Sequence, residues 1–258
     1  MSLLEVNDLH KAYGAFRAVQ GVSFSLEKGE MLALIGPNGA GKSTTFNMVG
    51  GQTTANAGSV LLNGKPVLGM KGRDIWKRGV GRTFQIAATF ASLTVAENVQ
   101  MTLLSYHQRI FSFVKAADTQ YRPEALALLE QVGMAEQADR PCSELAYGDV
   151  KRVELAMALA NDPVLLLMDE PTAGMAPQER NELMALTRQL AQQRQMGVLF
   201  TEHSMDVVFN YADRILVLAA GWLIAEGTPE QIRNDPKVKE IYLGSGLGLE
   251  TLKEGVPS

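Results

Sequence analysis

The chain has 258 residues, of which 46% are hydrophobic and 20% are charged, and its formal net charge is −4. This composition predicts one large globular domain or two small lobes, and it argues against disorder. The acidic balance argues against a surface built mainly to hold nucleic acid. A single cysteine, Cys142, excludes a disulfide framework and a thiolate metal cluster.

The N-terminal residues lack the charged start and long apolar core of a signal peptide. The longest nearly apolar run, residues 215–225, is interrupted by Gly221 and is too short to cross a bilayer. If the protein serves a membrane, we expect it to dock on other chains that span it.

The first segment favours β-strands. Residues 3–6 and 22–26 alternate between apolar and polar side chains, and residues 59–62 end at the turn-forming pair Asn63-Gly64. We expect these strands to form a β-rich lobe beside the loop that comes next.

A glycine-rich loop follows the apolar residues 31–35, which predict a buried strand. The loop matches the pattern G-x-x-x-x-G-K-[ST] at each fixed position, and a helix is predicted directly after it. Its residues are Gly36, Pro37, Asn38, Gly39, Ala40, Gly41, Lys42, Ser43 and Thr44. Strand, loop and helix together predict a nucleoside triphosphate site, whereas the alternative is a glycine turn that caps an ordinary helix.

The residue types of this loop explain the prediction. Glycines let backbone N–H groups approach phosphate oxygens, and the helix N-terminus adds free donors and a favourable dipole. We expect Lys42 to contact the β- and γ-phosphates, Ser43 to ligate Mg²⁺, and Thr44 to support a phosphate.

Residues 93–160 change to a helical pattern. Thr94 and Glu97 have capping-box spacing, Pro123 suits a helix start, and Gly133 suits a helix end. We therefore expect a helical subdomain, at about residues 92–160, inserted between two core strands.

The α/β pattern then returns. We predict strands at residues 164–168 and 197–201, a helix at 179–194, and a hairpin about Gly221. Residues 1–243 would form the domain, and residues 244–258 a flexible tail.

Asp169 and Glu170 come at the end of the strand predicted at residues 164–168. An aspartate there faces the ligand crevice of a parallel sheet, where it can hold Mg²⁺. Glu170 can take a proton from an attacking water. The alternative is a solvated acidic turn before Pro171.

The order of these motifs resembles that of the ATP-binding-cassette (ABC) ATPases, from Tyr13 to about residue 227. The resemblance implies an α/β fold, a P-loop NTPase core with a β-rich lobe and an inserted helical subdomain. It implies that Tyr13 stacks on adenine, that Gln85 senses the metal and the γ-phosphate, and that His203 is the switch histidine. Taken singly, each of these three residues could instead be an ordinary structural residue.

The family's signature motif has an altered form here, with the residues Leu145, Ala146, Tyr147, Gly148 and Asp149. Ala146 replaces a serine and Asp149 replaces a glutamine, which weakens the expected contact with the γ-phosphate of a partner's ATP. In the later loop at 175–177, Ala176 stands where the family has Asn or Asp, which weakens polar contact between paired subunits.

Residues 145–156, residues 82–85 and Tyr106-His107-Gln108 resemble one subgroup, the ATPase subunits of branched-chain amino acid importers. This resemblance implies ATP and Mg²⁺ as cofactors and a second cassette, identical or related, as partner. It also implies integral membrane permeases, indirectly a solute-binding protein, and a peripheral place on the cytoplasmic face of the membrane.

Other interpretations stay open. The solute could be urea, an amide or an aromatic acid. The chain could instead be a soluble ABC ATPase that remodels nucleic acid or ribosomes, or a nucleotide-dependent binding module without useful turnover.

Overall fold

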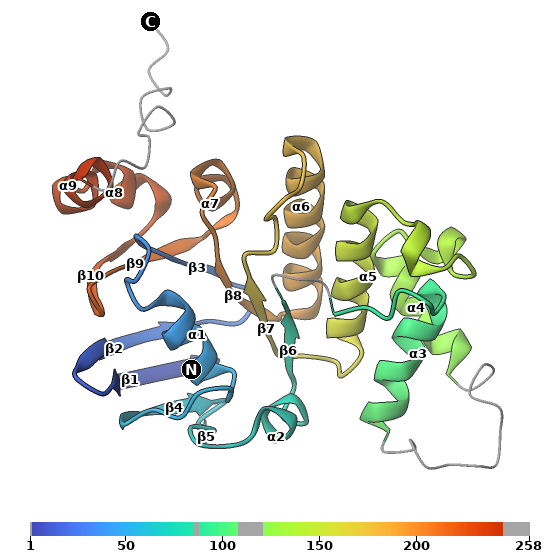
Figure 1. Cartoon of the computed structure of the whole chain (residues 1–258), viewed down its shortest axis with the longest axis horizontal. Helices are drawn as coiled ribbons and strands as arrows, with labels where there is room; N and C mark the ends of the chain where they lie inside the picture. The colour runs from blue at the N-terminus through green and yellow to red at the C-terminus, as the bar shows by residue number, and fades with distance from the viewer. Residues whose placement is uncertain (1, 85–87, 108–120, 245–258) are drawn as a thin grey trace, which may run out of the picture.

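The computed structural model describes residues 2–84, 88–107 and 121–244 (Figure 1). Gln85 and Gln108 lie outside the described residues, and so does the predicted tail beyond Gly244. Within the described part, no helix is long and apolar enough to span a membrane.

An antiparallel sheet forms the β-rich lobe, with the strand order β2-β1-β4-β5. Its strands are β1 (Leu4–Tyr13), β2 (Phe16–Leu26), β4 (Ala57–Leu62) and β5 (Lys65–Pro66). β1 and β2 are longer than predicted because shifts of register between them interrupt the alternation on which the prediction relied.

A second sheet forms the centre of the molecule, with the order β10-β9-β3-β8-β7-β6. Its strands are β3 (Met31–Ile35), β6 (Val80–Thr83), β7 (Leu165–Asp169), β8 (Gly197–Thr201), β9 (Arg214–Ala219) and β10 (Trp222–Gly227). All are parallel except β10, which pairs with β9 through the predicted hairpin. The carboxyl ends of β3, β7 and β8 therefore meet at one edge.

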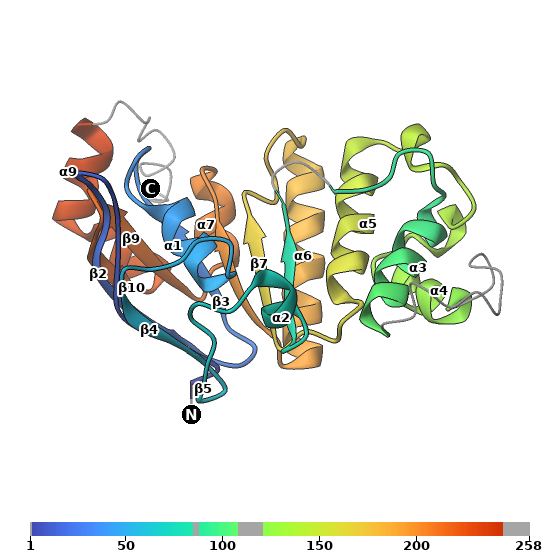
Figure 2. The same ribbon diagram turned by 60° about the horizontal axis from the view of Figure 1, so that its bottom comes forward.

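The helices around the sheets are α1 (Lys42–Val49), α2 (Gly72–Trp76), α3 (Val95–Tyr106), α4 (Arg122–Gln131), α5 (Tyr147–Leu159), α6 (Pro177–Arg194), α7 (Met205–Tyr211), α8 (Pro229–Asn234) and α9 (Pro236–Gly244). The helical group, α3 to α5, lies at one end of the molecule, away from the antiparallel sheet (Figures 1 and 2). The predicted capping box of Thr94 and Glu97 begins α3, Pro123 lies in the first turn of α4, and Gly133 follows that helix with φ 71°.

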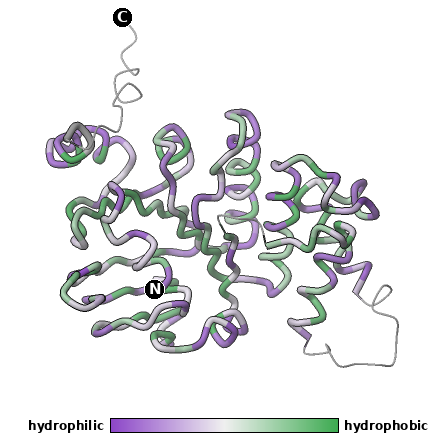
Figure 3. Tube along the Cα trace, in the orientation of Figure 1, coloured by the Kyte–Doolittle hydropathy of each residue, from purple (hydrophilic) through white to green (hydrophobic). Residues whose placement is uncertain are grey.

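Two apolar clusters cover the two faces of the central sheet. In β3, Met31 and Ala33 pack with the cluster that contains the helical group, whereas Leu32 and Leu34 pack with α1 and the antiparallel sheet. The hydropathy of the chain follows this arrangement, with the most hydrophobic segments at the centre (Figure 3). Each fully buried leucine contributes about 2 kcal/mol, so β3 is a rigid base for the loop that follows it.

Candidate active site

The glycine-rich loop connects β3 to α1 and packs closely against neighbouring strands. A Cβ atom on Gly36, which has φ +148°, would lie 2.1 Å from the carbonyl oxygen of Leu218 in β9. A Cβ atom on Gly41, with φ +100°, would lie 2.4 Å from the carbonyl oxygen of Ala18 in β2. No other residue type fits these two positions without a shift of backbone.

The loop ends at the N-terminus of α1. Gly41 is the N-cap residue and has no side chain that could cap the helix amides. Its carbonyl accepts the first helical hydrogen bond, from Thr45 N at 2.9 Å. The amides of Lys42, Ser43 and Thr44 therefore lie in the first turn, where helix N–H groups have no partner within the helix. No acidic residue lies in that turn, so the donors and the helix dipole suit a phosphate group.

Lys42 lies inside this loop. Its side chain is buried, and Nζ donates to the carbonyl oxygens of Gly36 at 2.7 Å and Pro37 at 3.1 Å. Burial lowers the pKa of Lys42, while the negative charges of Glu170 and Asp169 act in the opposite direction. The structure thus places the lysine within electrostatic range of both predicted carboxylates.

Asp169 ends β7, opposite Thr201 at the end of β8. Its Oδ1 accepts a hydrogen bond of 2.8 Å from the Thr201 hydroxyl, and its Oδ2 lies 3.6 Å from Arg82 Nη2. Two neighbouring strands therefore fix the orientation of this carboxylate.

Glu170 leaves the strand in a left-handed conformation, with φ 47°. Its amide donates to the carbonyl and the hydroxyl oxygen of Thr201, at 3.2 Å and 3.0 Å. Its Oε1 lies 2.8 Å from His203 Nε2. The structure thus joins two residues that the sequence predicted separately.

The loop that holds His203 is itself anchored by Glu202, which is buried. Glu202 Oε1 accepts hydrogen bonds from the Thr172 amide at 3.0 Å and from the Thr172 hydroxyl at 2.5 Å, and Oε2 accepts one from the His203 amide at 3.0 Å. This carboxylate ties the segment after β8 to the segment after Glu170.

The signature residues lie around the start of α5, in the helical group. Leu145 precedes Ala146, the N-cap residue, which makes no side-chain cap, and Tyr147 and Asp149 lie in the first turn. Gly148 is buried against α6, where a Cβ atom would meet Glu179 Oε1 at 3.0 Å. Ala176, the N-cap residue of α6, receives its cap from Glu179, whose Oε2 accepts from the Ala176 amide at 3.1 Å.

Tyr13 ends β1 and is 52% exposed, with Lys11 Nζ 5.0 Å from the centre of its ring. Its ring is therefore open to stacking. The prediction for Gln85 stays a prediction, because that residue lies outside the described part of the chain.

Sequence reasoning assigned no structural or site role to three charged residues, although they lie in segments that carry the resemblance. Arg82 is 12% exposed; its Nη2 donates to Asn47 Oδ1 at 2.8 Å, and its guanidinium lies over the rings of Phe46 and Phe84. Lys151 and Glu154 form a buried ion pair of 3.0 Å on α5. The signal available for the pair was its position among apolar residues on the buried face of α5, whereas the short strand around Arg82 gave no such signal.

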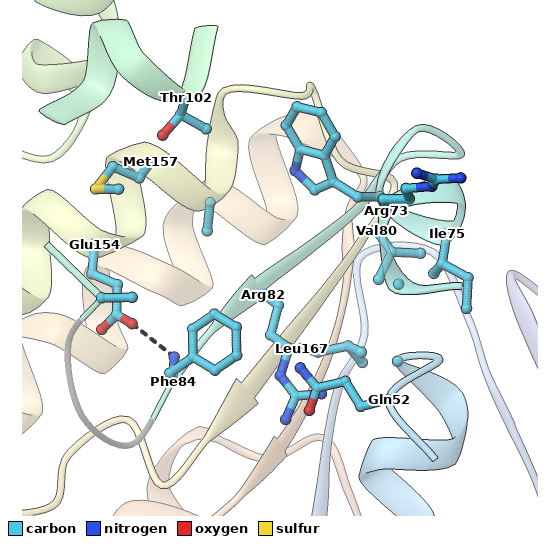
Figure 4. A pocket seen from close by; sticks show the side chains of 15 residues that line it. Gln52, Arg73, Ile75, Val80, Arg82, Phe84, Thr102, Glu154, Met157 and Leu167 are labelled. Atoms are coloured by element: carbon cyan, nitrogen blue, oxygen red, sulfur yellow. Dashed lines mark hydrogen bonds between the residues drawn. The ribbon is translucent and has the colours of Figure 1, made fainter. Parts of the chain in front are cut away.

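A cavity of about 270 Å³ lies between the helical group and the elements α2 and β6. Figure 4 shows Ile75, Val80, Phe84, Met157 and Leu167 on its walls, with Arg82 and Glu154 beside Phe84. Its lining comes from both parts of the molecule.

Comparison with known proteins agrees with this geometry. A family model described as "ABC transporter" matches residues 19–173, and one described as "Branched-chain amino acid ATP-binding cassette transporter" matches residues 223–247. The high-affinity branched-chain amino acid transport ATP-binding protein LivG of Escherichia coli (strain K12) is 40% identical, over 94% of this chain and 98% of LivG.

Two further proteins extend the comparison. The lipopolysaccharide export system ATP-binding protein LptB of Haemophilus influenzae is 35% identical, over 96% of this chain and all of LptB. The crystal structure of the ADP conformation of MJ1267, an ATP-binding cassette of an ABC transporter, is 32% identical and superposes with a TM-score of 0.85, over 95% of this chain and 99% of that one. The chain therefore belongs to the ABC transporter family, as an ATP-binding cassette ATPase that resembles the branched-chain amino acid transport ATP-binding proteins.

Proposed function

We propose that this chain hydrolyses ATP to power the import of amino acids, branched-chain ones in particular, through partner membrane subunits. The hydrogen bond between Glu170 and His203, at the sheet edge that also holds Lys42, supports the hydrolytic role. The similarity to LivG and the match at residues 223–247 support the solute class.

The chemistry is cleavage of the bond between the γ-phosphorus and its bridging oxygen by water. Glu170 accepts the proton of the attacking water through a carboxylate oxygen, and the product phosphate and ADP then separate. The contact of His203 Nε2 with Glu170 Oε1 holds the carboxylate in place before nucleotide binds. With ATP bound, the same imidazole would turn its N–H to the γ-phosphate and orient the attacking water. Lys42 and the amides of the loop stabilise the charge on the transferring phosphoryl group.

The residues present fit a magnesium ion. The hydroxyl of Ser43 and the carboxylate of Asp169 are hard oxygen donors, and Gln85 is a third predicted donor. Among the described residues, no three His, Cys, Asp or Glu side chains gather in a metal-binding cluster. Magnesium sites often use one or two carboxylates together with substrate phosphates. Bound there, the ion would neutralise charge on the β- and γ-phosphates.

The signature of this chain would act on the ATP that a partner cassette holds, and that partner is a second copy of the chain or a related chain. We infer that Leu145, Ala146, Tyr147, Gly148 and Asp149 of one chain face the ATP held by the other chain. The exposed Ala146 and Tyr147 at the N-terminus of α5 support this role, because the positive end of a helix dipole favours a phosphate group. ATP then holds the pair closed by its contacts with both chains, and hydrolysis weakens those contacts.

The membrane partner would contact the cavity between the helical group and β6. Its walls are mainly apolar and come both from the helical group and from the part of the molecule that holds α2 and β6. At this junction, the ring of Trp76 in α2 meets the ring of Tyr106 in α3 edge-on, with 5.6 Å between their centres. A segment of the membrane partner that binds there would respond to the position of the helical group relative to β6. The chain would therefore work as a peripheral subunit on the cytoplasmic face of the membrane. It would bind permeases, which receive their solute from a solute-binding protein.

The alternatives differ from this proposal in the direction of transport, in the solute or in the partner. The name of LptB places that relative in an export system, and urea, amides and aromatic acids remain other solutes for an importer. A role on nucleic acid is a further alternative, against which the net charge of −4 weighs.

The test is to recover the chain with its partners from membranes in detergent and to reconstitute the complex in vesicles. We expect release of phosphate that rises with leucine and its binding protein, together with uptake of labelled leucine. The proposal would be contradicted if the chain were recovered only with nucleic acid. It would also be contradicted if the complex exported leucine instead of importing it.

A further inference from the structure

A buried ion pair on α5 has no role in the mechanism given above. The side chains of Lys151 and Glu154 are 2% and 4% exposed, and Nζ lies 3.0 Å from Oε2. Burying two charges costs free energy, and an apolar pair of the same volume is often as stable. The contacts of this pair point to a use other than stability.

Both side chains hold the chain at the end of β6. The Phe84 amide donates to Glu154 Oε1 at 2.7 Å, which Figure 4 shows as a dashed line, and Lys151 Nζ donates to the Phe84 carbonyl at 2.7 Å. Glu154 also accepts from the Ala88 amide. Burial raises the pKa of Glu154, and the charge of Lys151 and these amides oppose that shift. The end of β6 is thus fastened to α5 by charge-assisted hydrogen bonds.

From Phe84, the contacts continue to the carboxylate at the end of β7. Arg82 lies two residues earlier, within β6, and the centre of the Phe84 ring is 5.2 Å from its guanidinium. Arg82 Nη2 is 3.6 Å from Asp169 Oδ2, and β6 and β7 are paired neighbours. A displacement of Asp169 therefore has a direct path to Phe84.

In the other direction, the contacts reach the signature. Lys151 Nζ lies 5.8 Å from the centre of the Tyr147 ring, in the first turn of α5. A continuous set of side chains thus joins Asp169 to Tyr147. We call this set, Asp169, Arg82, Phe84, Lys151, Glu154 and Tyr147, the relay.

We propose that Lys151 and Glu154 are positioning residues that transmit the state of the phosphate site to the first turn of α5. A shift of Asp169 on occupation of the phosphate site would move the end of β6 through Arg82, and the two charge-assisted bonds to Phe84 would make α5 move with it. The use of that movement at a second chain's ATP rests on the proposed function. The movement itself requires only that this chain binds nucleotide.

The test compares three proteins. The double variant Lys151→Met/Glu154→Gln removes both charges together, nearly keeps the volume, and leaves an acceptor for the Phe84 amide, so no unpaired charge is buried. Arg152→Met is the matched control, because it removes from the same helix a more exposed ion pair of 2.7 Å, which joins α5 to Glu182 of α6. The parent chain is the reference. Hydrogen exchange is measured with and without Mg²⁺ and a non-hydrolysable ATP analogue, at a concentration where light scattering shows monomers.

We expect the analogue to slow exchange in residues 36–44 equally in all three proteins. In residues 146–150 it should change exchange by at least fivefold in the parent and in Arg152→Met, but by less than twofold in the double variant. A relay that transmits nothing would leave the double variant responding like the parent, and a parent that shows no response at 146–150 would equally overturn the proposal.

Two additions keep the outcome clear. If the double variant fails to fold, Lys151→Gln/Glu154→Gln, which also buries no unpaired charge, must reduce the response at 146–150 by at least twofold, and an undiminished response overturns the proposal. Lys151→Arg, which keeps the charge and the donors, should retain most of the parent's response at 146–150. Failure of the proposed function is seen separately, as failure of ATP to pair two chains, and would leave the exchange result intact.

Discussion

Glu170 Oε1 and His203 Nε2 lie 2.8 Å apart, although the two residues follow different strands of the central sheet. The left-handed conformation of Glu170 turns its side chain toward His203, and Glu202 fixes the loop that presents the histidine. A carboxylate held in this way, beside a phosphate-binding loop, is suited to remove a proton from water.

Replacing Glu170 by glutamine should separate binding from turnover. The amide keeps the shape but accepts no proton, so we expect phosphate release to fall by about 10²–10⁴-fold, the usual contribution of a general base. The affinity for ATP, measured by calorimetry, should stay within about threefold, a change of less than 1 kcal/mol. A variant that hydrolyses ATP at the parental rate would remove Glu170 from this role.

Replacing His203 by alanine should act through Glu170. Loss of one hydrogen bond to a charged group costs about 1.5–3 kcal/mol, so we expect kcat to fall by about 10- to 100-fold while ATP binding is kept. In the double variant with Glu170→Gln, the loss should be much smaller than the product of the two single losses, because residues that act as a unit are not additive. Full multiplication of the two effects would show that the residues act independently.

Alanine at glycine positions of the phosphate loop should destabilise the protein in a set order. A Cβ atom at Gly36 or Gly41 would meet backbone oxygen at 2.1 Å or 2.4 Å, whereas Gly39, with φ +78°, has nothing within 4 Å of that position. We expect Gly39→Ala to cost about 1–2 kcal/mol from backbone strain alone and the other two substitutions to cost more. Urea unfolding measures the order, and equal losses at all three positions would contradict the packing described.

Serine at position 146 should improve the start of α5. Ala146 is an N-cap residue without a side-chain hydrogen bond, so we expect Ala146→Ser to raise the free energy of unfolding by about 1 kcal/mol. The opposite change in α3, Thr94→Ala, removes an existing capping box and should lower the free energy of unfolding by about the same amount.

The hydroxyl of Ala146→Ser should also affect pairing. In a Glu170→Gln background, we expect it to tighten ATP-driven pairing by about tenfold through a hydrogen bond to phosphate. Unchanged pairing would indicate that Ala146 does not face the partner's ATP.

The central elements were predictable from sequence because they depend on local patterns. The apolar runs of β3, β7 and β8, and the capping residues of α3 and α4, each identify an element without knowledge of its neighbours. The order of motifs then indicated the family. The apolar pattern predicts the start of α6 at Glu179, but the helix begins two residues earlier, at Pro177, because helix ends depend on capping geometry.

The contacts between distant residues were not predictable. The hydroxyl of Thr201 orients Asp169, and the pair of Lys151 and Glu154 holds Phe84, yet each contact joins residues far apart in the chain. Short strands such as β5, and the short helix α2, also escaped prediction because they contain too few residues for a period to show.

The central claim is that ATP joins two of these chains and that hydrolysis lets them part. The most direct test is the mass of Glu170→Gln in solution, measured by light scattering with and without ATP and Mg²⁺. We predict a monomer of 28.0 kDa without ATP and twice that mass with it, and no doubling when Lys42→Ala is added to the same variant. A Glu170→Gln chain that binds ATP in calorimetry yet stays monomeric at saturating ATP, both alone and when mixed with the related cassette of the same transporter, would contradict the account.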